Sequence, residues 1–246
     1  MSTRSNIEWT ETTWNPVTGC SKVSAGCAHC YAERMALRLQ AMDVHKYRHG
    51  FDVTVHKKAL DEPLRWRRPR HVFVNSMSDL FHPSVPTTFI QTVFAVMNQA
   101  SRHTFQVLTK RPERVQLINR RIEWTPNIWL GVSIESVRWL RRQEVLVATT
   151  ARTKFLSLEP LLGPLPDLTL DGIDWVIVGG ESGPGARPIH PAWVRSIRDA
   201  CVDNRVPFFF KQWGGQIKKR NGRVLDGRTW DQMPAASGAG DLKPGP

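Results

Sequence analysis

Three of the chain's four cysteines, Cys20, Cys27 and Cys30, lie within eleven positions of one another. Their spacing is C-x6-C-x2-C, and Tyr31 follows directly at the start of a helical pattern. Thiolates crowded on a loop that enters a helix are typical of a metal centre, because the helix N-terminus favours their negative charge. The sequence therefore predicts a metal site with these three cysteines as ligands.

Three interpretations of these thiols are open. A [4Fe–4S] cluster is normally held by four cysteines, so three would leave one iron free to bind a small molecule. Structural zinc takes four protein ligands, and His29, His56 or His82 would have to complete the site. The third interpretation is three unrelated buried thiols. Cys201 belongs to a later amphipathic segment and is predicted to be a small core residue.

Composition favours a globular protein with an anionic partner. The 246 residues are 41% hydrophobic and 23% charged, and their net charge is +12. No apolar run approaches the length of a membrane span, and the N-terminus has no apolar signal region. We therefore expect a cytoplasmic protein with reduced thiols, no membrane contact, and nucleic acid as a partner, with a partner protein as a further option.

The elements that must position the cysteines alternate between apolar, β-rich runs and amphipathic stretches. After a first strand near 12–20, the predicted strands are 71–79, 103–110, 127–136, 153–160, 173–183 and 206–215. The predicted helices are 32–42, 86–100, 111–120, 136–150 and 191–201. This alternation predicts an α/β fold with about six or seven parallel strands, either a complete or partial (β/α) barrel or a doubly wound sheet.

We expect a single domain over residues 1–233, followed by a disordered tail at 234–246. Residues 214–233 are predicted to form a C-terminal hairpin that turns at Asn221–Gly222. Residues 43–70 form a basic insertion after the first helix, whose aromatic residues either stack on bases or anchor a solvated loop. Its basic residues predicted to bind nucleic acid are Lys57, Lys58, Arg65, Arg67 and Arg68.

Polar residues follow the predicted strands in series, which indicates a common functional rim because parallel strands end at one edge. Lys110, Arg111 and Lys211 extend the predicted nucleic-acid-binding set. Glu159 and Glu181 are candidates for binding a ribose, an ammonium group or a proton; alternatively they pair with nearby basic residues to hold the rim together. The predicted cofactor-binding residues of this rim are Asn75, Ser76, Asp79, Ser133, Glu159 and Glu181.

Several motifs together resemble the phage-associated three-cysteine-motif family, largely a domain of unknown function that is similar at a distance to radical S-adenosylmethionine enzymes such as spore photoproduct lyase. The resemblance covers residues 5–233 and is carried by NPVTGC…GCAHCYAERMA, NSMSDLFH, LTKRPER, GVSIES, SLEPLLGP, VGGESGPGARP and FFFKQWGG. It implies a partial (β/α) barrel with a [4Fe–4S] cluster on the loop after the first strand. The open iron would chelate S-adenosylmethionine, whose reductive cleavage gives a radical that abstracts hydrogen from substrate.

By this resemblance the three cysteines are the cluster ligands, Tyr31 packs beside the cluster, and Asn75, Ser76 and Asp79 lie where such enzymes contact the methionine amino group. The first cysteine gap has six residues where those enzymes have three, and the Gly-Gly-Glu at 179–181 lies on a later strand than theirs. The expected function is an iron–sulfur radical enzyme, a lyase or transferase, that modifies or repairs nucleic acid. The alternative is a non-enzymatic phage protein, stabilised by zinc or a cluster, that binds nucleic acid or a partner.

Overall fold

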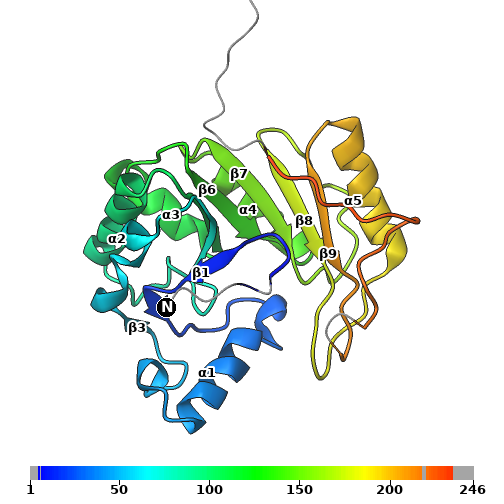
Figure 1. The fold of residues 1–246 in the computed structure, drawn as a ribbon. Helices are drawn as coiled ribbons and strands as arrows, with labels where there is room; N and C mark the ends of the chain where they lie inside the picture. The colour runs from blue at the N-terminus through cyan, green and yellow to red at the C-terminus, as the bar shows by residue number, and fades with distance from the viewer. Residues whose placement is uncertain (1–4, 6, 218–219, 235–246) are drawn as a thin grey trace, which may run out of the picture.

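Seven parallel strands form one sheet in a computed structural model that describes residues 5, 7–217 and 220–234. Their order in space is their order in the chain, as in a (β/α) barrel, and the sheet curves into an open half-barrel (Figure 1). The predicted partial barrel is confirmed, and the doubly wound alternative, which requires a reversal of strand order, is wrong. The strands are β1 (Thr12–Trp14), β4 (His71–Val74), β5 (Thr104–Thr109), β6 (Ile128–Ser133), β7 (Thr153–Leu158), β8 (Trp175–Gly179) and β9 (Phe208–Gln212).

Four α-helices return the chain along the outer face of the sheet, while the first lies beyond its carboxyl edge, at the bottom of Figure 1. The outer helices are amphipathic; α2, for example, buries Phe89, Val93 and Met97 at helical spacing. The first helix buries only alanines, Ala32 and Ala36. The α-helices are α1 (Tyr31–Ala41), α2 (Thr87–Gln99), α3 (Pro112–Ile118), α4 (Arg141–Val147) and α5 (Pro191–Asp203).

Aromatic side chains fill the concave face of the half-barrel toward the amino ends of the strands. Trp175 lies at the centre, with its ring 5.6–6.2 Å from the rings of Trp9, Trp129, Phe155 and Phe209. All five are buried. This packed floor leaves the carboxyl edge of the sheet as the open end of the half-barrel, where the predicted functional rim lies.

The insertion between α1 and β4 is confirmed as a separate excursion of the chain. Its short strand β3 (Thr54–Val55) pairs antiparallel with β2 (Val17–Thr18), which follows β1. Tyr47 and Trp66 are 9% and 8% exposed and pack into the interior, so they anchor the loop and are not free to stack on bases.

The short 3-10 helices of the described residues are η1 (Ala25–Cys27), η2 (His45–Tyr47), η3 (Lys57–Ala59), η4 (Glu62–Arg65), η5 (Asn119–Arg121) and η6 (Val137–Trp139).

The turn near the C-terminus is not where the sequence predicts it. Leu225 and Arg228 form an antiparallel bridge around Asp226–Gly227, and both turn residues have positive φ. Asp-Gly is as strong a signal for such a two-residue turn as Asn-Gly, and it is this pair that forms it. The predicted tail at 234–246 lies outside the described residues beyond Pro234.

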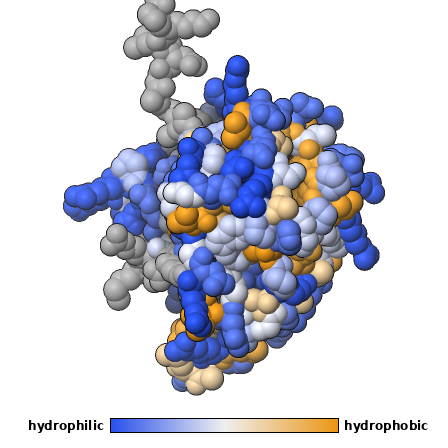
Figure 2. Space-filling view, turned by 90° about the vertical axis from the view of Figure 1, so that its right-hand side faces the viewer, coloured by the Kyte–Doolittle hydropathy of each residue, from blue (hydrophilic) through white to orange (hydrophobic). Residues whose placement is uncertain are grey.

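Hydrophilic side chains dominate the surface on the α5 side of the molecule, where apolar atoms appear as small separate groups (Figure 2). The large exposed apolar residues come from different elements, such as Met42 after α1, Leu117 in α3 and Val202 in α5. Within the described residues, no helix is long and apolar enough to cross a membrane.

Candidate functional site

The carboxyl ends of the strands gather the predicted site residues, because all seven main strands run in one direction. The loop from Gly19 to Cys30, here called the cysteine loop, leaves β2 and enters α1 along this edge. Its three thiols are free and partly exposed, whereas Cys201 is fully buried in α5 as predicted. Burial raises the pKa of Cys201 to about 12, so this thiol is not a ready ligand or nucleophile.

Cys20 lies at the end of a buried polar network. The Arg111 Nη1 donates to Cys20 Sγ at 3.5 Å and to Asp79 Oδ2 at 3.2 Å, while Nη2 donates to the Ser21 carbonyl at 2.9 Å. Asp79 is itself fixed by the Thr109 hydroxyl at 2.8 Å and by backbone amides. His82 completes the network through the Ser21 hydroxyl at 2.8 Å. The start of the cysteine loop is therefore held by a guanidinium that also faces its thiol.

Positive charge also acts on the second cysteine. Burial by itself raises the pKa of Cys27, but hydrogen bonds from Val23 and Ser24 and the charge of Lys110 outweigh it, and the pKa is lowered. Cys30 is the N-cap residue of α1, next to the helix N-terminus. The two thiols therefore differ: the surroundings favour the thiolate of Cys27, whereas burial and the nearby Asp79 outweigh Arg111 and raise the pKa of Cys20.

The middle of the cysteine loop is tied to β6 by a buried carboxylate. Glu135 is 0% exposed, accepts a hydrogen bond from the Gly26 amide at 3.3 Å, and pairs with Arg142 at 2.9 Å. Arg142 is also buried and packs against the Trp139 ring, 4.0 Å from its centroid. Its Nη2 is buried without a partner among the described residues, so a cationic donor next to the cysteine loop has unused hydrogen-bonding capacity.

A second carboxylate fixes the other side of the loop. Glu181 accepts from the Arg187 amide at 2.9 Å and Nε at 2.8 Å, and from His29 Nδ1 at 3.1 Å. Burial opposes its ionisation, but the hydrogen bonds from Arg187 and His29 outweigh this and hold the pKa of Glu181 at about 2. Arg187 Nη2 also donates to the Ala25 carbonyl at 2.9 Å. Glu181 is thus a positioning residue for the cysteine loop.

Glu159 forms the third carboxylate of the rim. It pairs with Lys211 at 2.8 Å and accepts from the Ser157 hydroxyl at 3.2 Å. Both members of the ion pair are largely buried, with side chains 14% and 17% exposed. The predicted alternative, in which Glu159 and Glu181 pair with Lys211 and Arg187 to hold the rim together, is the arrangement observed.

The segment after β4 contacts the start of α1. Tyr31 donates its hydroxyl to the Ser76 carbonyl, and Ser76 donates to Asn15 at 3.2 Å. Asn75 adopts a positive φ, which asparagine tolerates, and its Oδ1 accepts from the Val17 amide at 3.2 Å. Asn75 Nδ2 is buried without a partner in the described part of the chain. It is therefore an unused donor beside the cysteine loop.

The basic residues predicted to bind nucleic acid do not form one surface. Arg111 is 9% exposed and Lys211 is paired with Glu159, so both face the interior of the rim. Arg67 and Arg68 are exposed, but they precede β4 and therefore lie at the opposite, amino edge of the sheet. The Nη1 and Nη2 groups of Arg111 donate to Cys20, Asp79 and Ser21, so its guanidinium is engaged within the protein. The exposed members of the set are Lys57, Lys58, Arg65, Arg67 and Arg68.

Residues 4–234 match the family model described as "Protein of unknown function (DUF5131)". The chain belongs to this family. The match spans the whole half-barrel, the cysteine loop and every rim residue described above. No curated protein and no solved structure matches the chain.

The cysteine loop of this DUF5131 protein fits an iron–sulfur cluster by its donors and charges. Three soft thiols lie on one loop, with Cys30 at the N-terminus of α1, Arg111 on Cys20 and Lys110 acting on Cys27. Over the described residues, no three His, Cys, Asp or Glu side chains are grouped tightly enough for a single ion. His29, His56 and His82 instead bond Glu181, Thr18 and Ser21.

Ser21 and Arg142 belong to the DUF5131 site but not to the sequence-based prediction. Ser21 bridges Arg111 and His82, and nothing in its local pattern marks it. Arg142 carried a usable signal, because it shares a helix stripe with Val145 and Leu146, both buried. A charged residue on the apolar stripe of a helix needs a buried partner, which here is Glu135.

Proposed function

We propose that this DUF5131 protein is a radical S-adenosylmethionine-type enzyme that holds a [4Fe–4S] cluster on Cys20, Cys27 and Cys30 and modifies or repairs nucleic acid. The observation that carries the proposal is a three-cysteine loop at the carboxyl edge of a parallel half-barrel, with a guanidinium on one thiol. When bound, the cluster would supply the electron for reductive cleavage of S-adenosylmethionine. The resemblance to a phage-associated three-cysteine family and the net charge of +12 support the nucleic-acid part.

Residues around the cysteine loop position it and balance the charge of its thiolates. Arg111 and Lys110 offset the negative charge that three thiolates bring to the loop. Glu135 and Glu181 hold the loop from two sides, through Gly26 and through Arg187 and His29. The aromatic floor around Trp175 closes the half-barrel below the site, so that solvent reaches it from the carboxyl edge.

The cluster is tested by anaerobic purification followed by iron, sulfide and zinc analysis and an absorption spectrum. We expect about four irons per chain and a brown protein. Cys27→Ser should lose iron, while the matched variant Cys201→Ser should keep it, because Cys201 lies in the core of α5. A colourless wild-type protein without iron would refute the cluster, and one equivalent of zinc would support the non-enzymatic metal-stabilised alternative.

The reaction is tested separately on the reduced, iron-loaded protein. Addition of S-adenosylmethionine and dithionite should produce 5′-deoxyadenosine, measured by chromatography and mass spectrometry. Cys27→Ser serves as the inactive control. An iron-loaded protein that yields no 5′-deoxyadenosine, with or without added DNA or RNA, would contradict the enzymatic proposal while leaving the cluster in place.

A further inference from the structure

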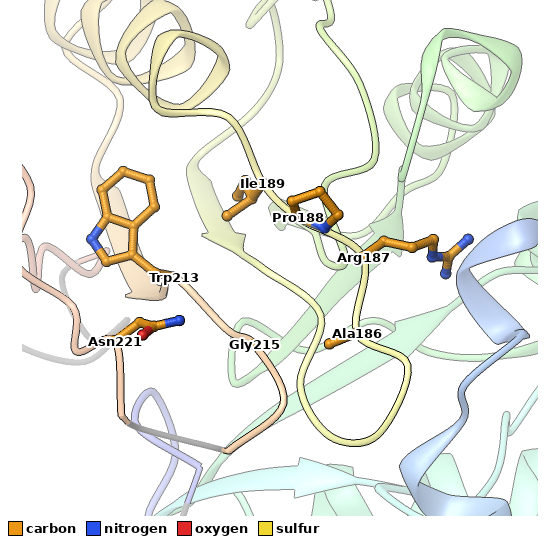
Figure 3. A pocket seen from close by; sticks show the side chains of 7 residues that line it. All are labelled: Ala186, Arg187, Pro188, Ile189, Trp213, Gly215 and Asn221. Carbon is orange, nitrogen blue, oxygen red and sulfur yellow. The ribbon is translucent and has the colours of Figure 1, made fainter.

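A hollow of about 500 Å³ lies between the loops that follow β8 and β9, next to the cysteine loop (Figure 3). We propose that it binds a single nucleobase, extruded or single-stranded, of the nucleic acid on which the protein acts; this role rests on the proposed function. Its lining residues are Ala186, Arg187, Pro188, Ile189, Trp213, Gly215 and Asn221.

The two loops are held together where they leave the sheet and separate further out. Ser182 and Gly215 form a parallel bridge, and the Gly215 amide donates to the Glu181 carbonyl at 2.7 Å. Gly180 lies against the Trp213 backbone, since a Cβ at this position would come within 2.1 Å of the Trp213 carbonyl oxygen. These contacts give the hollow a fixed base, so its two walls are set by the fold.

One wall of the hollow is an anchored indole. Trp213 donates Nε1 to the Val224 carbonyl at 2.9 Å, and its ring packs edge-on against Phe210 with centroids 4.7 Å apart. Across the hollow, Pro188 and Ile189 form an apolar wall (Figure 3). A held aromatic ring opposite aliphatic groups is suited to a flat ring, because stacking on aromatic side chains is how proteins bind unpaired bases.

The polar groups of the hollow favour a ring with a hydrogen-bonding edge. The Asn221 carboxamide is oriented by its own Nδ2, which donates to the Gly214 carbonyl at 2.9 Å. A fixed carboxamide is a side chain that reads base edges. Arg187 points away from Trp213 toward the cysteine loop, and its charge is paired with Glu181 (Figure 3). The lining therefore favours recognition of the base over recognition of a phosphate.

The position of the hollow links this base to the metal loop. Arg187, which lines the hollow, donates to the Ala25 carbonyl of the cysteine loop at 2.9 Å. A base bound in the hollow would thereby lie next to the loop that carries the thiols. Such a pocket selects the nucleotide that is taken out of the stack for chemistry.

Calorimetric titration of the metal-free protein with nucleoside 5′-monophosphates and with ribose 5-phosphate, which lacks a base, tests the proposal. We expect binding of at least one nucleotide and none of ribose 5-phosphate. Trp213→Leu should weaken binding about tenfold or more, by the usual loss on removing a stacking ring. Asn221→Ala, at an exposed position, should leave the fold intact and alter the preference among bases.

Trp193→Leu is the matched control, because Trp193 is a partly buried indole on α5 that stacks on His190 outside the hollow. Equal binding of ribose 5-phosphate, equal loss in the two tryptophan variants, or absence of nucleotide binding would each overturn the proposal. Because the titration uses protein without metal, its outcome is independent of the iron and 5′-deoxyadenosine measurements that test the enzyme.

Discussion

Replacing Glu181 by Gln should destabilise the protein at neutral pH and weaken the hold on the cysteine loop. The pKa of Glu181 is about 2, against an ordinary value of 4.5, because Arg187 and His29 stabilise its charged form. A shift of this size corresponds to about 3 kcal/mol of stability at pH 7. Since the Arg187 side chain is 32% exposed, solvent screening reduces the expected loss to about 1–2 kcal/mol.

The contribution of Glu181 to the free energy of unfolding depends on pH in a predictable direction. A carboxyl group with a lowered pKa stabilises the folded protein fully above pH 4.5, and this contribution is lost as the pH falls toward 2. The glutamine variant has no such group, so the free energies of unfolding of the two proteins should converge in acid. Urea unfolding of both metal-free proteins at pH 7, 5 and 3 measures this convergence.

Asp199→Asn is the control for this experiment, because Asp199 pairs with Arg198 at 2.6 Å but is 61% exposed. A surface pair of this kind is worth about 0–1 kcal/mol. If Glu181→Gln unfolds at the same urea concentration as the wild type at pH 7, or if their difference stays constant into acid, the role of Glu181 as a charged anchor is refuted.

Three other experiments test the site and its support. Arg111→Gln removes the donor to Cys20, so it should lower the reduction potential of the loaded cluster in a redox titration, and Arg111→Lys should restore part of the shift. Gly131→Ala should lower the free energy of unfolding by about 1–3 kcal/mol in urea, because the added Cβ would lie within 2.3 Å of the buried Phe155 ring. Cys201, with its pKa raised to about 12, should resist iodoacetamide at pH 8 in the folded protein and react once it is unfolded, as mass spectrometry of the labelled peptide would show.

The order and direction of the strands could be predicted from the sequence because each apolar run alternates with an amphipathic one. The same pattern placed Asp79, Glu159 and Glu181 at one edge, since a residue that follows a parallel strand has nowhere else to lie. The turn at Asp226–Gly227 was missed because two equivalent dipeptide signals stand five positions apart, and pairing with distant β9 decides between them.

The direction of a side chain at that edge could not be predicted, because it depends on which partners the other strands bring. Arg111 and Lys110 are adjacent and both basic, yet Arg111 turns inward to Asp79 and Cys20 while Lys110 stays partly exposed. The network that decides this joins residues 20, 21, 79, 82 and 111, which meet only in the folded sheet. The sequence around any one of these residues does not indicate which of the others it contacts.

The basic side chains that face inward determine where the excess positive charge of the protein is available to a polyanion. Arg111, Arg142, Arg187 and Lys211 are each paired with a carboxylate of the rim, so these four pairs add nothing to the net charge of +12 and do not offer their charge to a phosphate. Under the proposed function, the backbone of a nucleic acid would meet the exposed basic residues outside the rim, and a base near the thiols would be recognised by uncharged groups. The hollow beside Trp213, with its indole, its apolar wall and its carboxamide, supplies such groups at that position.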